Sequence, residues 1–355
     1  MRDPSTALGT GGKVGFGILG LGIGLLHAQQ VTDLPNAYLA AACDADAARL
    51  ERLGDLACAR YSDYDALLAD PQVDVVCICA PNNLHAELGI RAARAGKHVL
   101  VEKPIETRLD KADSLIAACR EAGVKLGVVS QLRFCPASQK VKRAMEQGVL
   151  GRPILGDVYM KFYRAQEYYD QATWRGTRAG DGGGCLINQG IHGLDLLLWM
   201  MGPLACVDGF AETKARRIEV EDTAAAVCKF ESGALGVIEG TTSVWPDLHL
   251  RLELHGEKGT ILLGGTEMTY VSKWRTLDNP DDAGNEEPEP ELAGGWAGPF
   301  RQGWLHRAQL ADMADAVLRD RPPAVTGEDG RRVLEAIHAI YRASETGQRV
   351  TLPLS

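Results

Sequence analysis

The feature that most constrains this chain is an alternation of short apolar runs with helix-like segments through residues 14–130. The apolar runs have the length of strands and are Val14–Leu19, Ala37–Cys43, Val73–Cys79, His98–Val101 and Val124–Val129. The segments between them follow a helical pattern and are Ile23–Asp33, Ala45–Leu56, Leu84–Ala95 and Leu109–Ala122. Strands that are apolar on both faces are typical of a parallel sheet covered by helices on each side. The sequence therefore predicts an α/β fold that opens with a doubly wound parallel sheet.

From residue 156 onward the pattern changes to longer strands that alternate polar with apolar residues, as in an antiparallel sheet. These strands are Asp157–Arg164, Cys206–Ala215, Thr223–Phe230, Ala234–Ser243 and His249–Gly256. The other expected elements are helices at Cys185–Met201, Leu305–Leu318 and Gly330–Ser344, a solvated acidic loop at Asp278–Glu291, and an extended Val350–Pro353. We expect a loose leader at residues 1–12, one domain at 13–132 and a second at 133–355.

Charge and length limit the classes of partner. The chain has 355 residues, more than one compact core usually holds, and a formal net charge of −9 at pH 7. An acidic surface repels nucleic-acid phosphates and anionic lipid, so we expect neither nucleic acid nor a membrane as partner. No run approaches the ~20 apolar residues that a membrane-spanning helix needs.

The nine cysteines follow no regular spacing. Cys77 and Cys79 lie two apart in an apolar strand, and the sequence offers no further ligands beside them. We interpret them as small buried hydrophobic residues and predict no metal site. An odd number of cysteines in apolar settings favours a reducing compartment, so the predicted location is the cytoplasm.

A glycine turn after the first strand indicates a dinucleotide. Gly20, Gly22 and Gly24 surround Leu21 and Ile23 at the start of a helix, so that backbone N–H groups can face a pyrophosphate. The third glycine comes one residue earlier than in the usual spacing, which leaves its assignment open. Asp44 ends the second strand, where a carboxylate binds ribose hydroxyls and repels a 2′-phosphate, although it can also cap the next helix. The prediction is NAD, with NADP disfavoured.

Two further strand ends point to the same crevice, because ligands of open parallel sheets lie beyond the carboxyl ends of the strands. The residues expected to line the cofactor are Ala80, Pro81, Asn82, Asn83 and His85 after one strand, and Glu102 and Lys103 after the next. Lys103 is expected to be functional because Pro104 fixes its place at a strand end.

In the predicted helix Cys185–Met201, Asn188, His192 and Asp195 are spaced four and three apart and share one face. A carboxylate beside a histidine suits proton transfer, although a buried histidine with structural hydrogen bonds is the alternative. We predict that His192 accepts a proton, held by Asp195. For a ligand that carries a hydroxyl, Asn188 can orient that group through its amide, and Lys103 can stabilise the alkoxide formed when the proton leaves. A zinc site is not predicted, because no third ligand has a convincing spacing.

These motifs resemble the Gfo/Idh/MocA oxidoreductase family over nearly the whole chain from Lys13 to Pro353. The resemblance rests, in order, on Gly20-x-Gly22 with His27, Asp44, Pro81–His85, Gly96–Pro104, Gln131–Phe134, Trp174-Arg175-Gly176, Gly182–Gly184 through Trp199, and Arg321-Pro322-Pro323.

The resemblance implies a Rossmann domain followed by an α/β domain with a large, open, mostly antiparallel sheet. It also implies that Lys103 lies near the nicotinamide, that His192 is the proton acceptor, and that Gln131, Trp174 and Arg175 join the cofactor set. Many polyol-oxidising members have Asp where this chain has Asn188, while the surrounding pattern is also similar to the branch acting on nucleotide sugars and hexoside C3 hydroxyls. Family members commonly form homodimers or homotetramers through the sheet of the second domain.

The predicted function is that of an NAD-dependent dehydrogenase, which oxidises a secondary hydroxyl of a sugar, glycoside, cyclitol or nucleotide sugar to a ketone. The alternatives are a catalytically silent dinucleotide-binding sensor and an NADPH-linked keto-sugar reductase. Residues considered for substrate binding, beside Lys103, Asn188 and His192, are Arg164 and Tyr169, with Tyr168, Arg178 and His306 as further options. The substrate, the reacting carbon and the direction of reaction stay open.

Overall fold

The computed structural model describes residues 12–265, 270–281 and 303–354, which fall into two units. The first unit comprises residues up to 131 together with 303–331, and the second comprises 132–281 and 332–354. The first break lies one residue from the expected position, but residues 303–331 belong with the first unit and not, as expected, with the second domain. Residues 1–11 of the expected leader, and the part of the acidic loop after residue 281, lie outside the described residues.

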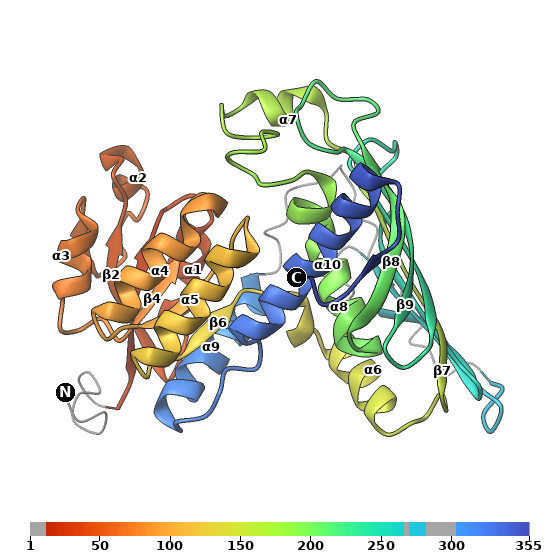
Figure 1. Cartoon of the computed structure of the whole chain (residues 1–355). Coiled ribbons are helices and arrows are strands. Elements are labelled where there is room, and N and C mark those ends of the chain that lie inside the picture. The colour runs from red at the N-terminus through yellow and green to blue at the C-terminus, as the bar shows by residue number, and fades with distance from the viewer. Residues whose placement is uncertain (1–11, 266–269, 282–302, 355) are drawn as a thin grey trace. The chain divides into compact units, whose positions relative to one another are not determined.

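The first unit contains a six-stranded parallel sheet in the order β3-β2-β1-β4-β5-β6 (Figure 1). Its strands are β1 (Val14–Leu19), β2 (Ala37–Cys43), β3 (Ala59–Tyr61), β4 (Val75–Ile78), β5 (His98–Val101) and β6 (Leu126–Val128). Its helices include α1 (Gly24–Thr32), α2 (Ala47–Glu51), α3 (Tyr64–Ala69), α4 (His85–Arg94), α5 (Leu109–Glu121) and α9 (Gly303–Leu318). The doubly wound parallel fold predicted from the sequence is confirmed.

The sheet is buried on both faces, which explains why its strands are apolar without alternation. Phe16 and Ile18 of β1 pack with α1 and with Leu310 and Met313 of α9 on one face. On the other face, Gly89 of α4 allows α4 to lie close to α5 and β4, since a Cβ there would meet the side chains of both.

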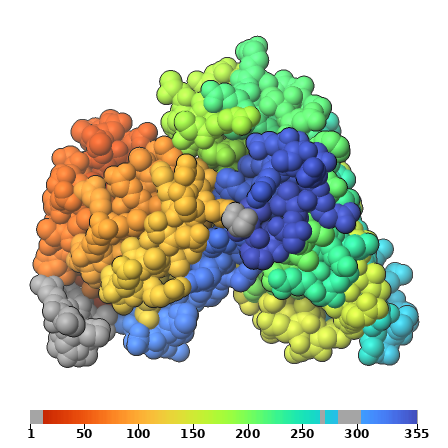
Figure 2. Space-filling model, viewed as in Figure 1, coloured from red at the N-terminus to blue at the C-terminus, as the bar shows by residue number. Residues whose placement is uncertain are grey.

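The α9 helix is tied to the first unit by polar contacts as well as apolar ones. The Gln309 side chain accepts a hydrogen bond from the Ser130 N–H and donates one to the Val128 carbonyl, at 2.9 and 2.7 Å. Lys125 also forms an ion pair with Asp320, just after α9, at 2.8 Å. In Figure 2 the light-blue atoms of this segment lie against the yellow atoms of the first unit. This return of the chain could not be read from local patterns.

The second unit contains an eight-stranded sheet in the order β13-β12-β11-β7-β10-β9-β8-β14. Its strands are β7 (Pro153–Lys161), β8 (Leu204–Glu212), β9 (Thr223–Phe230), β10 (Leu235–Thr241), β11 (His249–Gly256), β12 (Gly259–Gly265), β13 (Tyr270–Thr276) and β14 (Val350–Thr351). Only β7 and β10 pair in parallel; the other neighbours are antiparallel. The mostly antiparallel second sheet is therefore confirmed, although β12 and β13 were not predicted.

The helices of the second unit include α6 (Pro136–Glu146), α7 (Gln166–Asp170) and α8 (Ile191–Met201), and α10 (Gly327–Thr346) runs across the break at residue 331. The predicted single helix Cys185–Met201 is in fact a π-helical turn, Leu186–Gly190, that runs into α8. The expectation that Asn188 shares a face with His192 assumed uniform α-helical rotation, so the π turn changes the angle between them. Among the described residues, no helix is both long and apolar enough to cross a membrane.

Candidate active site

The glycine turn between β1 and α1 has a separate role for each glycine. Gly20 has φ +87°, and a Cβ there would meet the Cys79 carbonyl oxygen at 2.5 Å, so no larger residue fits. The Cβ position of Gly22 faces open space, which a ligand can approach. A Cβ on Gly24 would meet the Ile18 side chain at 2.8 Å. Gly24 thus provides the close helix–strand packing expected of a third glycine, despite its early position.

Asp44 lies at the end of β2 and braces this turn. Its buried carboxylate accepts hydrogen bonds from the backbone N–H groups of Leu21, at 2.7 Å, and Asp46, at 3.0 Å. Arg49, which is half exposed, places its guanidinium 3.5 Å from Asp44. Arg49 was not singled out in the sequence, so this ion pair was missed.

His85 joins the turns that follow β4 and β5. It is fully buried, and its ring nitrogens lie 2.7 Å from the Pro104 carbonyl oxygen and 2.9 Å from that of Ala80. Burial lowers the pKa of His85 although both carbonyls favour protonation. Both ring nitrogens are engaged with the backbone, so His85 holds the two turns together. Its expected contact with the cofactor stays a prediction.

Glu102 lies in a buried cluster beneath the turn after β5, while the adjacent Lys103 is only partly buried. The Glu102 carboxylate lies 2.7 Å from Nε2 of His27 on α1. Burial would raise the pKa of Glu102, but the hydrogen bond with His27 and the positive charges nearby together outweigh it and lower the pKa to about 2. Burial would lower the pKa of His27, but Cys77 and Glu102 raise it to about 10. The Glu102 carboxylate is therefore ionised and paired with His27 in the interior of the first unit.

His306 of α9 belongs to this same cluster. Its ring packs edge-on against His27 with centroids 5.3 Å apart, and burial lowers its pKa to about 4. His306 was considered for the substrate pocket, but it is buried in the core of the first unit. Gln131, at the end of that unit, has a buried side-chain oxygen without a hydrogen-bond partner among the described residues.

In the second unit, residues 185–201 leave few side chains accessible. Within this stretch only Asn188, Gln189, His192 and Trp199 are partly exposed, and the rest are buried. Three of these four carry amide or imidazole groups, which makes this polar strip the accessible side of an otherwise apolar helix.

Asp195 is not part of the accessible strip, because it forms a buried bidentate ion pair with Arg133. The Arg133 Nε and Nη2 atoms donate to the two carboxylate oxygens of Asp195 at 2.8 and 2.6 Å. Arg133 also lies over the Trp199 ring. The prediction that Asp195 holds His192 stays a prediction. Arg133 was seen only as part of a motif, and its partner is 62 residues away.

Glu221 fixes the start of the π turn. Its buried carboxylate accepts hydrogen bonds from the N–H groups of Gly184 and Leu186, at 2.8 and 3.0 Å, and from the Tyr341 hydroxyl at 2.7 Å. Burial raises the pKa of Glu221, against the effect of these donors. A Cβ on Gly184 would meet the Glu221 carbonyl oxygen at 1.7 Å, which explains the glycine. The sequence carried no signal for Glu221.

Tyr168 connects the expected cofactor-contacting pair to the polar strip. Its hydroxyl accepts hydrogen bonds from Arg175, at 2.7 Å, and from Gln189, at 3.2 Å. The Arg175 guanidinium lies 4.6 Å from the ring centroids of both Tyr168 and Trp174. The structure therefore brings Trp174, Arg175 and the π turn together.

Arg164 and Tyr169, both expected to bind substrate, are buried. Arg164 donates to the Tyr163 carbonyl and lies 3.7 Å from the Asp247 carboxylate. The Tyr169 hydroxyl bonds to Thr242 at 2.8 Å, and burial raises its pKa to about 12. These contacts favour a supporting role for both side chains.

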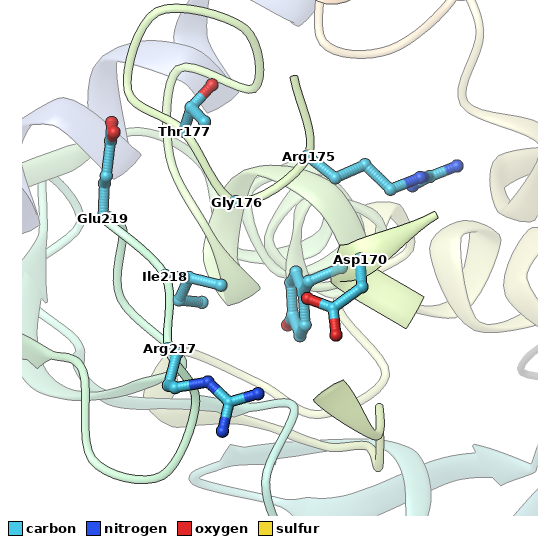
Figure 3. Close-up of a pocket in the computed structure, with 8 residues that line it drawn as sticks. Asp170, Arg175, Gly176, Thr177, Arg217, Ile218 and Glu219 are labelled. Carbon is cyan, nitrogen blue, oxygen red and sulfur yellow. The ribbon is translucent and has the colours of Figure 1, made fainter. Parts of the chain in front are cut away.

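The second unit contains a hollow of about 420 Å³, and Tyr169 is one of the residues that line it. Its charged lining includes Asp170 and Arg217, whose side chains reach toward the same space, while Arg175 extends away from Arg217 and Glu219 (Figure 3). Arg178, which was also considered for substrate binding, is exposed and donates its backbone N–H to Glu219.

Comparisons with known proteins agree with this arrangement. The model of the Gfo/Idh/MocA oxidoreductase family with an NAD-binding Rossmann fold matches residues 14–130, and that of the family's C-terminal domain matches residues 138–262. The chain is 30% identical to myo-inositol 2-dehydrogenase of Thermotoga maritima, over 95% of this chain and 98% of that one. It is 30% identical to the NAD⁺-dependent scyllo-inositol 2-dehydrogenase of Bacillus subtilis, over 96% of each.

A solved structure is also similar. The WlbA dehydrogenase of Bordetella pertussis, in complex with NADH and UDP-GlcNAcA, superposes with a TM-score of 0.84 at 33% identity, covering 97% of this chain and all of that one. One family model lies within the first unit and the other within the second, and these relatives extend over nearly the whole chain. The chain therefore belongs to the Gfo/Idh/MocA family of NAD-binding oxidoreductases.

Proposed function

We propose that this protein oxidises a secondary hydroxyl of a sugar, glycoside, cyclitol or nucleotide sugar to a ketone, with NAD as the oxidant. The observation that carries the proposal is the polar strip Asn188, Gln189 and His192 on a helix whose other residues are almost all buried. Such a strip offers hydrogen bonds and a proton acceptor to a polyhydroxylated ligand. The relatives named above, which include inositol dehydrogenases and a dehydrogenase bound to a nucleotide sugar, support the substrate class.

The first unit fits the dinucleotide. The open Cβ position at Gly22 gives room for a pyrophosphate beside the N-terminus of α1, and Asp44 offers its carboxylate to ribose hydroxyls. We propose that Ile23, the turn residues 80–83, Lys103 and Gln131 complete this site, with Trp174 and Arg175 contributing from the second unit. When bound, NAD⁺ accepts the hydride from the substrate carbon.

In the proposed mechanism His192 accepts the proton of the substrate hydroxyl, because imidazole is the side chain whose ordinary pKa lies near neutrality. Lys103 places positive charge on the developing alkoxide. Asn188 orients the hydroxyl through its amide and exchanges no proton. Arg164 and Tyr169 act indirectly. Arg164 holds Asp247 in place, and Tyr169 holds Thr242.

A panel of polyols tests the substrate class. We expect NADH formation, followed by its absorbance at 340 nm, with at least one of myo-inositol, scyllo-inositol, a hexoside and UDP-GlcNAcA. Binding of NADH without turnover on every member, in either direction, would favour the silent sensor. Faster reduction of a keto-sugar by NADPH than by NADH would favour the reductase.

The His192→Ala and Lys103→Ala variants test the roles of these residues. Each should lower turnover by about 10²–10⁴-fold, the usual contribution of general acid–base groups. The His192 change should leave NADH affinity, measured by fluorescence titration, unaltered. Near-native turnover of His192→Ala on the true substrate would move the proton-acceptor role to Lys103.

We also propose that the protein forms a homodimer or homotetramer through the sheet of the second unit. Phe210, Val227 and Leu235, on three neighbouring strands, are 57–68% exposed, and apolar side chains on a sheet face favour a partner. Light scattering at micromolar concentration should give a multiple of the 38.2 kDa chain mass. A monomer mass would contradict it.

The proposed location is the cytoplasm, on the ground that all nine cysteines are free thiols. Cell fractionation of the source organism checks this, and recovery in an oxidising compartment would overturn it.

A further inference from the structure

The buried cluster in the first unit contains two thiols and an imidazole that the proposed reaction does not use. Cys77 lies in β4 and Cys79 follows it directly, so both side chains leave the same face of the strand. That face packs against α1, which carries His27. One ligand atom from each of the three residues lies within 4.8 Å of the others.

The separation of the two sulfur atoms matches a shared metal ion. The Cys77 and Cys79 sulfurs are 3.7 Å apart. In a tetrahedral zinc site with Zn–S bonds of about 2.3 Å, two sulfur ligands lie about 3.8 Å from each other. Both cysteines are also buried, at 0% and 8% exposure, where competing water is excluded.

His27 supplies an independent indication. Its side chain is 1% exposed, and its buried Nδ1 bonds to no nitrogen or oxygen atom within the described part of the chain. The Cys77 sulfur lies beside the ring, close enough to raise the pKa of His27. The other nitrogen, Nε2, lies 2.7 Å from the Glu102 carboxylate. Histidines that bind metals usually donate their second N–H to such a carboxylate, which fixes the tautomer and turns the other nitrogen toward the ion. Glu102 is placed to do this for His27. In the metal-free protein His27 is protonated, because Cys77 and Glu102 raise its pKa to about 10, so an ion would bind by displacing the proton on Nδ1.

From this geometry we infer that His27, Cys77 and Cys79 form a binding site for a thiophilic metal ion, Zn²⁺ or Cu⁺, with Glu102 as a positioning residue. Thiolate and imidazole ligands select these soft or borderline ions over Mg²⁺ and Ca²⁺. Three ligands suffice for Cu⁺ and leave a fourth position open on Zn²⁺. The inference departs from our sequence-based expectation of no metal, because His27 lies 50 residues from Cys77 and its approach depends on the fold.

The site would have a structural role close to the dinucleotide turn. An ion would link α1 to the end of β4, and the Cys79 carbonyl is the atom against which Gly20 packs. The ion takes no part in hydride transfer, so the inference does not depend on the proposed substrate.

Metal analysis of the purified full chain tests the inference. The protein is expressed with added Zn²⁺ in one arm, and loaded anaerobically with Cu⁺ during refolding in another, since the site is buried and fills as the chain folds. We expect one equivalent of metal per chain after gel filtration in at least one arm. An empty wild-type chain in both arms would overturn the inference.

Matched variants locate the ion. Cys77→Ser and Cys79→Ser should each lose the bound metal, whereas Cys119→Ser, at another buried cysteine of the first unit, should retain it. Glu102→Gln should weaken binding about 10- to 100-fold, as removal of such a supporting group typically does. Retention of metal by both serine variants in the cluster would refute the assignment.

A spectroscopic readout covers the case in which a serine variant fails to fold. Wild-type protein expressed with Co²⁺ should show thiolate-to-cobalt charge-transfer absorption in the near ultraviolet. Cys119→Ser should give the same spectrum. Bound cobalt without any thiolate band would place the metal elsewhere and contradict the proposal.

Discussion

The dinucleotide turn in the first unit and the polar strip in the second are built in different ways. The residues of the turn follow one another in the chain, with Gly20 and Gly24 allowing its close packing, and the end of the next strand, at Cys43 and Asp44, accepts hydrogen bonds from its backbone. The strip depends on residues far apart in sequence, since Arg133 holds Asp195 and Glu221 holds the N–H groups of Gly184 and Leu186. A turn set by local backbone can be recognised from a short motif, whereas a helix fixed by distant side chains cannot.

The largest effect should follow from breaking a distant contact in the second unit. Asp195→Ala removes the carboxylate that pairs bidentately with the buried, charged Arg133, which should cost about 3–5 kcal/mol of unfolding free energy in denaturant titration. The double change Arg133→Met with Asp195→Leu should recover most of that loss. A single variant as stable as wild type would show that the pair does not hold the helix.

The same double variant addresses the role of Asp195. If the carboxylate serves only Arg133, turnover of the refolded double variant stays near wild type. A fall of about 10²-fold or more in turnover, with stability restored, would support the prediction that Asp195 holds His192.

In the first unit, substitutions of Gly20 and Gly22 should have different effects, one on the stability of the fold and the other on NADH binding. Gly20→Ala forces a non-glycine residue to φ +87° and against the Cys79 carbonyl, and should cost at least about 1–2 kcal/mol of stability. Gly22→Ala adds a methyl to open space, so it should leave thermal stability unchanged and weaken NADH binding. Equal losses of stability in both variants would contradict the separate roles given to them.

Much of the fold was predictable where a pattern is uninterrupted. The bounds of β1, β2, β5, β9 and β11 agree with the expected ones, because each is either continuously apolar or strictly alternating. The three-residue β3 and the glycine-rich β12 carry too little pattern to be recognised. They exist because pairing with β2 and with β11 supplies their hydrogen bonds.

The site was predictable to the extent that its residues end strands or share a helix. Asp44 and Lys103 follow strands, and His192 lies on a mostly apolar helix in which the few polar residues stand out. Arg49 and Glu221 gave no comparable signal, since each acts through a contact that only the folded backbone creates.

Arg49 leads to a smaller, specific effect on cofactor choice. Asp44→Ser removes the acceptor for the ribose hydroxyls and one of the two carboxylates paired with Arg49, so that the guanidinium, which keeps Asp46 at 3.7 Å, can bind a 2′-phosphate. We expect the ratio of kcat/KM for NADP to that for NAD to rise about tenfold, a difference of about 1.4 kcal/mol. The Asp44→Ser, Arg49→Ala double variant should lose that rise. An equal rise without Arg49 would contradict its role.

The smallest effect concerns acid stability of the first unit. The Nδ1 atom of His98 accepts the Lys125 N–H at 3.0 Å, and burial, together with the Lys125 charge, lowers the pKa of His98 to about 4. This neutral histidine stabilises the fold above about pH 6.5, and its contribution is lost as the pH falls from there to about 4.

His98→Asn keeps an acceptor for Lys125 and does not titrate. Between pH 7 and 4 it should lose about 1 kcal/mol less unfolding free energy than wild type. The control is His249→Asn in the second unit, a change at a more exposed histidine that leaves the contact between His98 and Lys125 intact. An unchanged slope in His98→Asn would remove this histidine as a source of acid sensitivity.

The return of residues 303–331 to the first unit has a consequence for biosynthesis. When the ribosome has released the first 131 residues, the Val128 carbonyl, the Ser130 N–H and the surface that receives Leu310 and Met313 are still uncovered. They are covered only after β7 to β13 of the second unit have been translated. The cofactor unit therefore cannot complete its fold until residues 303–331 have been made, and a gene fusion that exchanges it must carry two separate stretches of coding sequence.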